Sequence, residues 1–337
     1  MAFQAMRLDF VIPLYNEGPS LCGFHDSLLA AAASLPHELR FLYVDDGSQD
    51  DTGKILAELA RADARVQPIT LSRNFGHQAA LSAGIEAASG DAVVMMDGDG
   101  EHPPALVPEM VRLYEAGYDV VQTQRHEAGR GLGFKRASGA AFYWLINRLG
   151  ETHIAEGAAD FRLLSRDAVS ALRQLREYHR FYRGLVEWIG FRSVILPYTP
   201  APRLAGRSKY SLLKMLRLAE DGLFSFSLAP LRLALVIGVL FLVILTVEIV
   251  YVLSLWARGA ERSLVPGWSS LMIMLTMSSA ISMILLGILG FYVGMIFEEV
   301  KRRPVYVVRP EAQGTGERSR AHIAFPDAHS GNDSGFR

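Results

Sequence analysis

The sequence predicts an α/β domain with a mostly parallel sheet, followed by two apolar helices that form a membrane hairpin. Three observations support this prediction. Short apolar runs alternate with helical patterns in residues 1–125, two long apolar runs lie further along the chain, and basic residues flank them. We expect the α/β domain at 1–206, interfacial helices at 207–230, the hairpin at 231–300, and a basic segment with a disordered tail at 301–337.

The predicted elements of the domain follow one another in a regular order. Strands are expected at residues 8–13, 41–45, 66–71, 92–97 and 119–123. Helices are expected at residues 21–33, 52–61, 78–88 and 105–116. Further helices are expected at 134–149 and 166–175, and a further strand at 192–198. This alternation is typical of a parallel sheet with helices on both faces.

The segment 211–226 predicts one or two amphipathic helices. Its apolar residues recur at helical spacing, opposite Lys214, Arg217 and Glu220. We expect these helices to lie on the surface of a lipid bilayer. The alternative is a helix that packs on the α/β domain.

Two apolar runs predict membrane-spanning helices. Residues 231–256 carry only two charged side chains, and residues 268–297 carry none. Either run can cross about 30 Å of hydrocarbon. Cations flank the hairpin in the sequence. Those before it are Arg203, Arg207, Lys209, Lys214, Arg217 and Arg232, and those after it are Lys301, Arg302, Arg303 and Arg309. The positive-inside rule places both ends of the hairpin, and hence the α/β domain, in the cytoplasm.

Composition excludes several classes of protein. The formal net charge is −1, so no overall bias favours nucleic acid, and we expect no nucleic-acid partner. The single cysteine, Cys22, cannot form an intramolecular disulfide or a multi-cysteine metal site. The first twenty residues contain no uninterrupted apolar core of the kind that a signal peptide needs.

Three polar clusters each follow a predicted strand. They are Pro13-Leu14-Tyr15-Asn16-Glu17, Asp45-Asp46-Gly47-Ser48 and Asp97-Gly98-Asp99-Gly100-Glu101. Ligands of an open parallel sheet bind beyond the carboxyl ends of its strands. We therefore expect the three clusters to meet in one cleft.

The residue types in these clusters fit a nucleotide and a metal ion. Asp45 or Asp46 can accept hydrogen bonds from a ribose hydroxyl or a pyrimidine N–H, although Asp-Gly-Ser also makes ordinary turns. Asp97 and Asp99 are two residues apart and can ligate a hard divalent cation. Mg²⁺ or Mn²⁺ held there would neutralise the diphosphate of a nucleotide sugar.

Motifs along most of the chain resemble those of the family 2 glycosyltransferases, in their dolichol-phosphate mannose synthase-like branch. The donor-side motifs are residues 11–17, 45–52, 71–76, 83–84 and 90–91. The acceptor-side motifs are residues 160–163, 180–184 and 206–211. Residues 225–232 and 300–306 resemble the flanks of the family's membrane hairpin. The resemblance covers residues 7–310.

The resemblance implies a GT-A nucleotide-diphospho-sugar transferase fold and an inverting transfer. The expected donor is a nucleotide diphosphate sugar, by preference UDP-glucose, and the expected acceptor is a polyprenyl phosphate such as undecaprenyl phosphate. The implied setting is a homo-oligomer in the bacterial inner membrane that serves cell-envelope or lipopolysaccharide modification. The implied metal ligands are Asp97, Asp99 and the residue at position 101, which is Glu101 here where the family usually has Gln.

The expected site residues fall into three groups. The donor-binding residues are Pro13, Tyr15, Asn16, Glu17, Asp45, Asp46, Arg73, Asp97 and Gly98. The residues expected at the acceptor phosphate are Arg125, Arg136, Arg207 and Ser208. The catalytic residues are Asp97, Asp99, Arg125, Arg203 and Lys209. A phosphate acceptor is already anionic at neutral pH, so it needs cations rather than a general base.

Several alternatives stay open at this point. A processive polysaccharide synthase would carry a Gln-x-x-Arg-Trp motif, which no tryptophan of this chain provides. An inactive membrane scaffold of the same fold would not need its acidic motifs intact. Each cation can instead be a surface residue or contact anionic lipid. Asp160 can serve catalysis or bond to Arg162, and we interpret His102 as a loop residue rather than a ligand.

Overall fold

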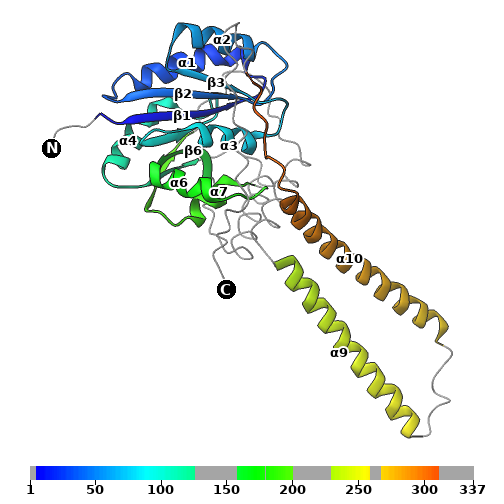
Figure 1. Ribbon diagram of the computed structural model, residues 1–337. Helices are drawn as coiled ribbons and strands as arrows, with labels where there is room; N and C mark the ends of the chain where they lie inside the picture. The colour runs from blue at the N-terminus through cyan, green and yellow to red at the C-terminus, as the bar shows by residue number, and fades with distance from the viewer. Residues whose placement is uncertain (1–4, 126–157, 179, 200–228, 259–266, 311–337) are drawn as a thin grey trace, which may run out of the picture.

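The computed structural model describes residues 5–125, 158–178, 180–199, 229–258 and 267–310 (Figure 1). Its strands are β1 (Arg7–Leu14), β2 (Glu38–Asp45), β3 (Val66–Thr70), β4 (Ala92–Met95), β5 (Val120–Arg125), β6 (Ala158–Ser165) and β7 (Ser193–Tyr198). The helices of the domain are α1 (Gly18–Ala32), α2 (Thr52–Ala62), α3 (His77–Ala87), the 3-10 turn η1 (Pro104–Leu106), α4 (Val107–Glu115), α6 (Arg166–Gln174) and α7 (Tyr182–Trp188).

The seven strands form one sheet in the order β3-β2-β1-β4-β6-β5-β7. Strand β6 runs antiparallel to both of its neighbours, β4 and β5, and all the other described strand pairs are parallel. Because the first four strands and their crossover helices repeat the same unit, the carboxyl ends of β1, β2 and β4 lie at one edge of the sheet. That edge is where the sequence places the polar clusters.

Alternating side chains of the strands bury two apolar layers. Phe10 and Ile12 of β1 contribute to a core under α1 and α4, whereas Val11 between them contributes to a second core with residues of α3, α6 and α7. Both faces of the sheet are therefore covered, which explains why its strands are apolar on both sides.

The predicted strands at 8–13, 41–45, 66–71, 92–97, 119–123 and 192–198 are confirmed to within a few residues, as are the helices that separate the first five. Strand β6 and helix α7 were not predicted. The helix expected at 134–149, the interfacial helices and the C-terminal tail lie outside the described residues. The domain boundaries stay predictions.

Helices α9 (Ala229–Ala257) and α10 (Trp268–Lys301) extend from the domain and contact one another (Figure 1). Their described apolar side chains are largely exposed, for example Val247 and Met283. By length and composition one segment of the described chain, Met277–Lys301, is able to span a membrane, and Val236–Tyr251 in α9 is a shorter apolar stretch. The structure thus supports one candidate span, and the predicted two-helix hairpin stays a prediction.

A histidine and a tyrosine form a hydrogen bond inside the core between α1 and β2. His25 Nδ1 lies 2.9 Å from the hydroxyl of Tyr43, and both residues are buried. Burial lowers the pKa of His25, against the opposing effect of Asp63 and Asp26. The neutral imidazole is therefore the form that the folded protein prefers.

We expect this histidine to make the protein less stable in acid. The unfolded chain binds a proton at His25 near pH 6.5, and the folded chain binds it only at lower pH. Stability from this group is therefore present above pH 6.5 and is lost as the pH falls, by at most about 1.4 kcal/mol per pH unit. The double variant His25→Leu/Tyr43→Phe, which removes both polar groups together, should lose this contribution. Thermal unfolding midpoints of both proteins at pH 7.5 and 5.5 test this, and equal pH dependence would contradict it.

Candidate active site

The loops after β1 and β2 are bonded to one another at the edge of the sheet. The backbone N–H of Asn16 donates to Ser48 Oγ at 2.9 Å, and the N–H of Gln49 donates to Asn16 Oδ1 at 2.8 Å. Asn16 adopts a left-handed conformation (φ 54°), which asparagine tolerates better than most residues. The first two predicted clusters therefore form a single structural unit, with the Tyr15 side chain 37% exposed beside it.

Asp46 holds the loop that follows β3. Its two carboxylate oxygens accept hydrogen bonds from the N–H groups of Phe75 (2.7 Å) and Gly76 (2.9 Å). Burial raises the pKa of Asp46, and these two bonds oppose that rise. Asp45 is likewise buried and accepts a bond from the Ser48 N–H at 2.8 Å. Contact of either carboxylate with a nucleotide sugar stays a prediction, whereas the hydrogen bonds by which they hold the loops are present in the structure.

Gly47 is where the two loops touch. It has a positive φ of 67°, and a Cβ at this position would lie 2.5 Å from the backbone carbon of Arg73. A side chain here would therefore be strained and would also push the 71–76 loop away. The Arg73 guanidinium lies over the Phe75 ring, 4.1 Å from its centroid, on the exposed side of that loop.

The third cluster follows β4 and packs closely on the end of β1. A Cβ at Gly98 would lie 2.4 Å from Leu14 Cδ2, so any larger residue there would require the Leu14 side chain to move. The N–H of Asp97 donates to His102 Nδ1 at 2.9 Å, and the His102 ring stacks on Phe161 at a centroid distance of 5.2 Å. His102 belongs to a loop, as interpreted, but it is buried and positions Asp97.

One carboxylate oxygen of this cluster is left without a hydrogen-bond donor. Asp97 Oδ1 is buried and accepts no hydrogen bond, although His77 Nε2 lies 3.5 Å away. Burial raises the pKa of Asp99; the Glu101 N–H bond opposes this effect, and the charges of Asp97 and Glu101 add to it. An oxygen without a donor beside like charges fits a hard divalent cation.

Glu101 is paired with an arginine. Arg125 Nη2, at the end of β5, lies 3.2 Å from Glu101 Oε2. No group of three or more His, Cys, Asp and Glu side chains gathers as a metal site among the residues that the structure describes. The predicted three-carboxylate ligand set therefore stays a prediction, and the arrangement favours Asp97 and Asp99 over Glu101.

A buried ion network lies beside Asp97. Asp160 accepts bonds from Arg162 Nη2 at 3.1 Å and from Arg183 Nη2 at 2.8 Å, and His77 Nε2 lies 3.7 Å from it. Burial alone would raise the pKa of Asp160, but Arg183, His77 and Arg162 hold it well below its usual range. Burial lowers the pKa of Arg162 to about 10. Burial also lowers the pKa of His77, but Asp97 and Asp160 outweigh it and raise the pKa to about 9.

The structure thus brings together the predicted donor and metal residues from β1, β2 and β4. The bond from Arg162 to Asp160, one of the two alternatives for that residue, is present. Arg136, Arg203, Arg207, Ser208 and Lys209 lie outside the described residues, so their roles stay predictions. Sequence reasoning missed His77, the first residue of α3, although a histidine that directly follows a glycine at the start of a helix was a usable signal.

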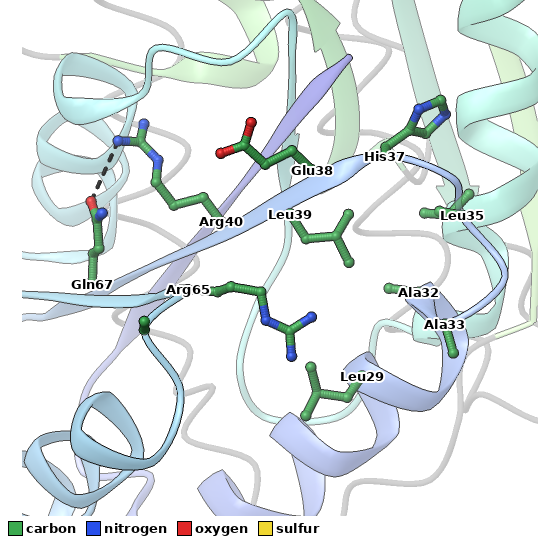
Figure 2. Close-up of a pocket in the computed structure, with 11 residues that line it drawn as sticks. Leu29, Ala32, Ala33, Leu35, His37, Glu38, Leu39, Arg40, Arg65 and Gln67 are labelled. Atoms are coloured by element: carbon green, nitrogen blue, oxygen red, sulfur yellow. Dashed lines mark hydrogen bonds between the residues drawn. The ribbon is translucent and has the colours of Figure 1, made fainter. Parts of the chain in front are cut away.

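A cavity of about 600 Å³ lies at the opposite edge of the sheet, between α1 and the starts of β2 and β3 (Figure 2). Both arginines of its lining are already paired. Arg40 bonds to Asp9 and Gln67, and Arg65 Nη2 bonds to Asp63 Oδ2 at 2.7 Å. The polar clusters lie at the other edge of the sheet, away from this cavity.

Comparison with known proteins places the chain in a family. The model of "Glycosyl transferase family 2" matches residues 9–173. A Bacillus subtilis protein named "Uncharacterized glycosyltransferase YkcC" is 37% identical over 309 residues, which cover 90% of this chain and 94% of that protein. The chain belongs to glycosyl transferase family 2. It is a glycosyltransferase, and its predicted GT-A-like α/β fold with a mostly parallel sheet is confirmed.

Two further similarities complete the comparison. The "SfII prophage-derived bactoprenol glucosyl transferase" of Shigella flexneri is 33% identical over 313 residues, covering 92% of this chain and 99% of the relative. Among solved structures, "Mannosyltransferase PcManGT from Pyrobaculum calidifontis in complex with GDP-Man and Mn2+" has a TM-score of 0.44 at 16% identity, covering 84% of this chain and 88% of that one.

Proposed function

We propose that this glycosyltransferase moves a sugar from a nucleotide diphosphate sugar to a polyprenyl phosphate at the cytoplasmic face of a bacterial membrane. The observation that carries the proposal is the carboxylate cluster at the end of β4, where Asp97 Oδ1 has no hydrogen-bond partner. The name of the Shigella flexneri relative, a bactoprenol glucosyl transferase, supports a lipid-linked acceptor and glucose as the sugar. UDP-glucose is the donor that we prefer.

The residues present fit a divalent cation. Asp97 and Asp99 would hold Mg²⁺ or Mn²⁺, which when bound would neutralise the charge that develops on the nucleotide diphosphate. His102 fixes the backbone of Asp97, and the bond from the Glu101 N–H to Asp99 Oδ1 at 2.9 Å orients the second carboxylate. The loops that hold Asn16, Asp45 and Asp46 flank this position and would bind the nucleoside.

The acceptor end of the reaction depends on positive charge. Arg125 lies beside the carboxylate cluster and forms an ion pair with Glu101. We assign it to the acceptor phosphate together with Arg136, Arg203, Arg207, Ser208 and Lys209. A phosphate acceptor is anionic at neutral pH, so it attacks without a general base. Charge neutralisation and positioning of the two phosphates then account for catalysis.

We also propose that α9 and α10 together cross the membrane as a hairpin. The segment Met277–Lys301 is long and apolar enough to span a bilayer. The basic residues Lys301, Arg302 and Arg303 at its end are exposed, as expected for the cytoplasmic side. The hairpin would keep the catalytic domain beside the lipid acceptor.

The test is a transfer assay with detergent-purified protein and undecaprenyl phosphate. A panel of UDP- and GDP-sugars is supplied with Mg²⁺, with Mn²⁺ or with EDTA, and the glycolipid is identified by mass. We expect a product that needs metal, with UDP-glucose as the best donor. Binding of UDP with no lipid product from any donor would contradict the proposed acceptor, and full activity in EDTA would contradict the metal site.

A further inference from the structure

The chain that follows α10 returns to the catalytic domain and pairs with the end of β3, the outermost strand of the sheet. We call residues 305–309 the C-terminal strap. The N–H of Ser72 donates to the carbonyl of Val307 at 2.8 Å, and the N–H of Arg309 donates to the carbonyl of Thr70 at 2.7 Å. Leu71 and Val308 form an antiparallel bridge between these two bonds. The strap thus pairs with the chain where β3 ends, on the free side of this edge strand.

One side chain of the strap enters the core. Tyr306 packs against a small apolar cluster of Val44, Leu71, Ala80 and Ala83, and burial raises the pKa of its hydroxyl. This cluster lies directly beneath the 71–76 loop, because Phe75 packs against it as well. The strap therefore supports that loop both through its backbone and through an aromatic ring.

The loop that the strap supports is part of the donor site. Asp46 binds the N–H groups of Phe75 and Gly76, and Gly47 packs on the backbone of Arg73. A displacement of the loop would break both contacts and disturb the Asp45-Asp46-Gly47-Ser48 turn. His77, which lies 3.5 Å from Asp97, follows the loop directly at the start of α3.

A second contact fixes the end of α10 to the domain. The N–H of Tyr178 donates to Glu299 Oε1 at 2.7 Å. Helix α10 is thus attached to the domain through Glu299, near the end of the helix, and the chain is attached again through the strap. Two separated attachments restrict rotation of the domain about the end of the helix more than one attachment would.

We propose that the C-terminal strap is a positioning element for the nucleotide donor. The strap lies outside residues 9–173, which the family model matches. It holds the 71–76 loop in the shape that the contacts of Asp46 and Gly47 require. Donor affinity then depends on a segment that directly follows the membrane-side helix. This inference rests on the proposed function, because it takes residues 45–48 and 71–76 to bind the donor.

The test compares point variants of the full chain. Tyr306→Ala removes the ring, and Arg309→Pro removes the N–H that donates to Thr70. We expect each to raise the KM for the nucleotide sugar and the Kd for UDP by about tenfold, the effect of losing roughly 1.4 kcal/mol of binding. The kcat and the KM for polyprenyl phosphate should stay within about twofold. Tyr306→Phe should behave as the unchanged protein, since the contacts of the ring are apolar.

Controls separate positioning from general stability. Val308→Ala changes an exposed side chain of the same strap, and Arg309→Ala removes only the side chain that contacts the carbonyl of Ser72. Both should keep the donor KM. A lowered unfolding midpoint of Tyr306→Ala and Arg309→Pro with an unchanged donor KM would overturn the proposal and leave the strap a stability element. Failure of the unchanged protein to bind any nucleotide would instead overturn the proposed function.

Discussion

Replacing Asp99 with asparagine is expected to lower kcat for sugar transfer by at least about 1,000-fold, which corresponds to about 4 kcal/mol of lost transition-state stabilisation. Asparagine is isosteric, and its side-chain oxygen can still accept the hydrogen bond from the Glu101 N–H. The loop should therefore keep its shape while the negative charge is lost. Asp99→Ala should be as inactive, with membrane insertion intact.

The measurement is glycolipid formation at saturating donor, together with Mn²⁺ affinity measured by calorimetry. A matched control is Glu109→Gln, which neutralises an exposed carboxylate on α4 that pairs with Arg112. That variant should keep full activity and metal affinity. If Asp99→Asn retains transfer, the reacting centre does not lie at the end of β4.

Replacing Asp9 with alanine is expected to destabilise the domain by about 3–5 kcal/mol, the usual effect of breaking a buried ion pair. Asp9 lies on β1 with no exposed surface, and it accepts bonds from the N–H groups of Ser89 (2.6 Å) and Gly90 (2.8 Å). It also binds the guanidinium of Arg40, through Nε at 3.0 Å and through Nη2. Alanine would leave two backbone donors without their acceptor and would remove the carboxylate that pairs with the half-buried Arg40.

This effect is a large part of the 5–15 kcal/mol that typically separates folded from unfolded domains. For a domain of this size we expect the unfolding midpoint to fall by about 10 °C. Glu38→Ala, an exposed carboxylate on the neighbouring strand, is the matched control and should shift the midpoint little. A midpoint for Asp9→Ala close to that of this control would show that the ion pair contributes little to stability.

The parallel half of the sheet was predictable because each strand there is an apolar run that ends in polar residues. Strand β6 was not predictable in this way. Its charged residues Asp160 and Arg162 alternate with Phe161 and Leu163, and the sequence is therefore interpreted as a polar motif. Both charged residues are nevertheless buried, since they pair with each other and Asp160 also pairs with Arg183. Partners supplied by another segment are invisible to local periodicity.

The meeting of the acidic clusters at one edge of the sheet was predictable, but the neighbours of each carboxylate were not. Asp46 reads as a nucleotide ligand, yet its two oxygens are bonded to the N–H groups of Phe75 and Gly76, 29 and 30 residues away. Glu101 reads as a metal ligand, yet it pairs with Arg125 across 24 residues. Spacing along the chain indicates which strand ends meet, and only the folded structure shows which neighbours each group finds there.

The reversed direction of β6 has a consequence for how this enzyme can diverge. Strand β5 ends at Arg125, and β6, which pairs with it in the opposite direction, begins at Ala158 beside Gln124. Both ends of the intervening connection therefore open at the same edge as the carboxylates. Insertions, deletions or replacement between these two ends enter at the edge of the carboxylates and need not alter any strand register. Evolutionary change can therefore accumulate in this connection while the folding core stays intact.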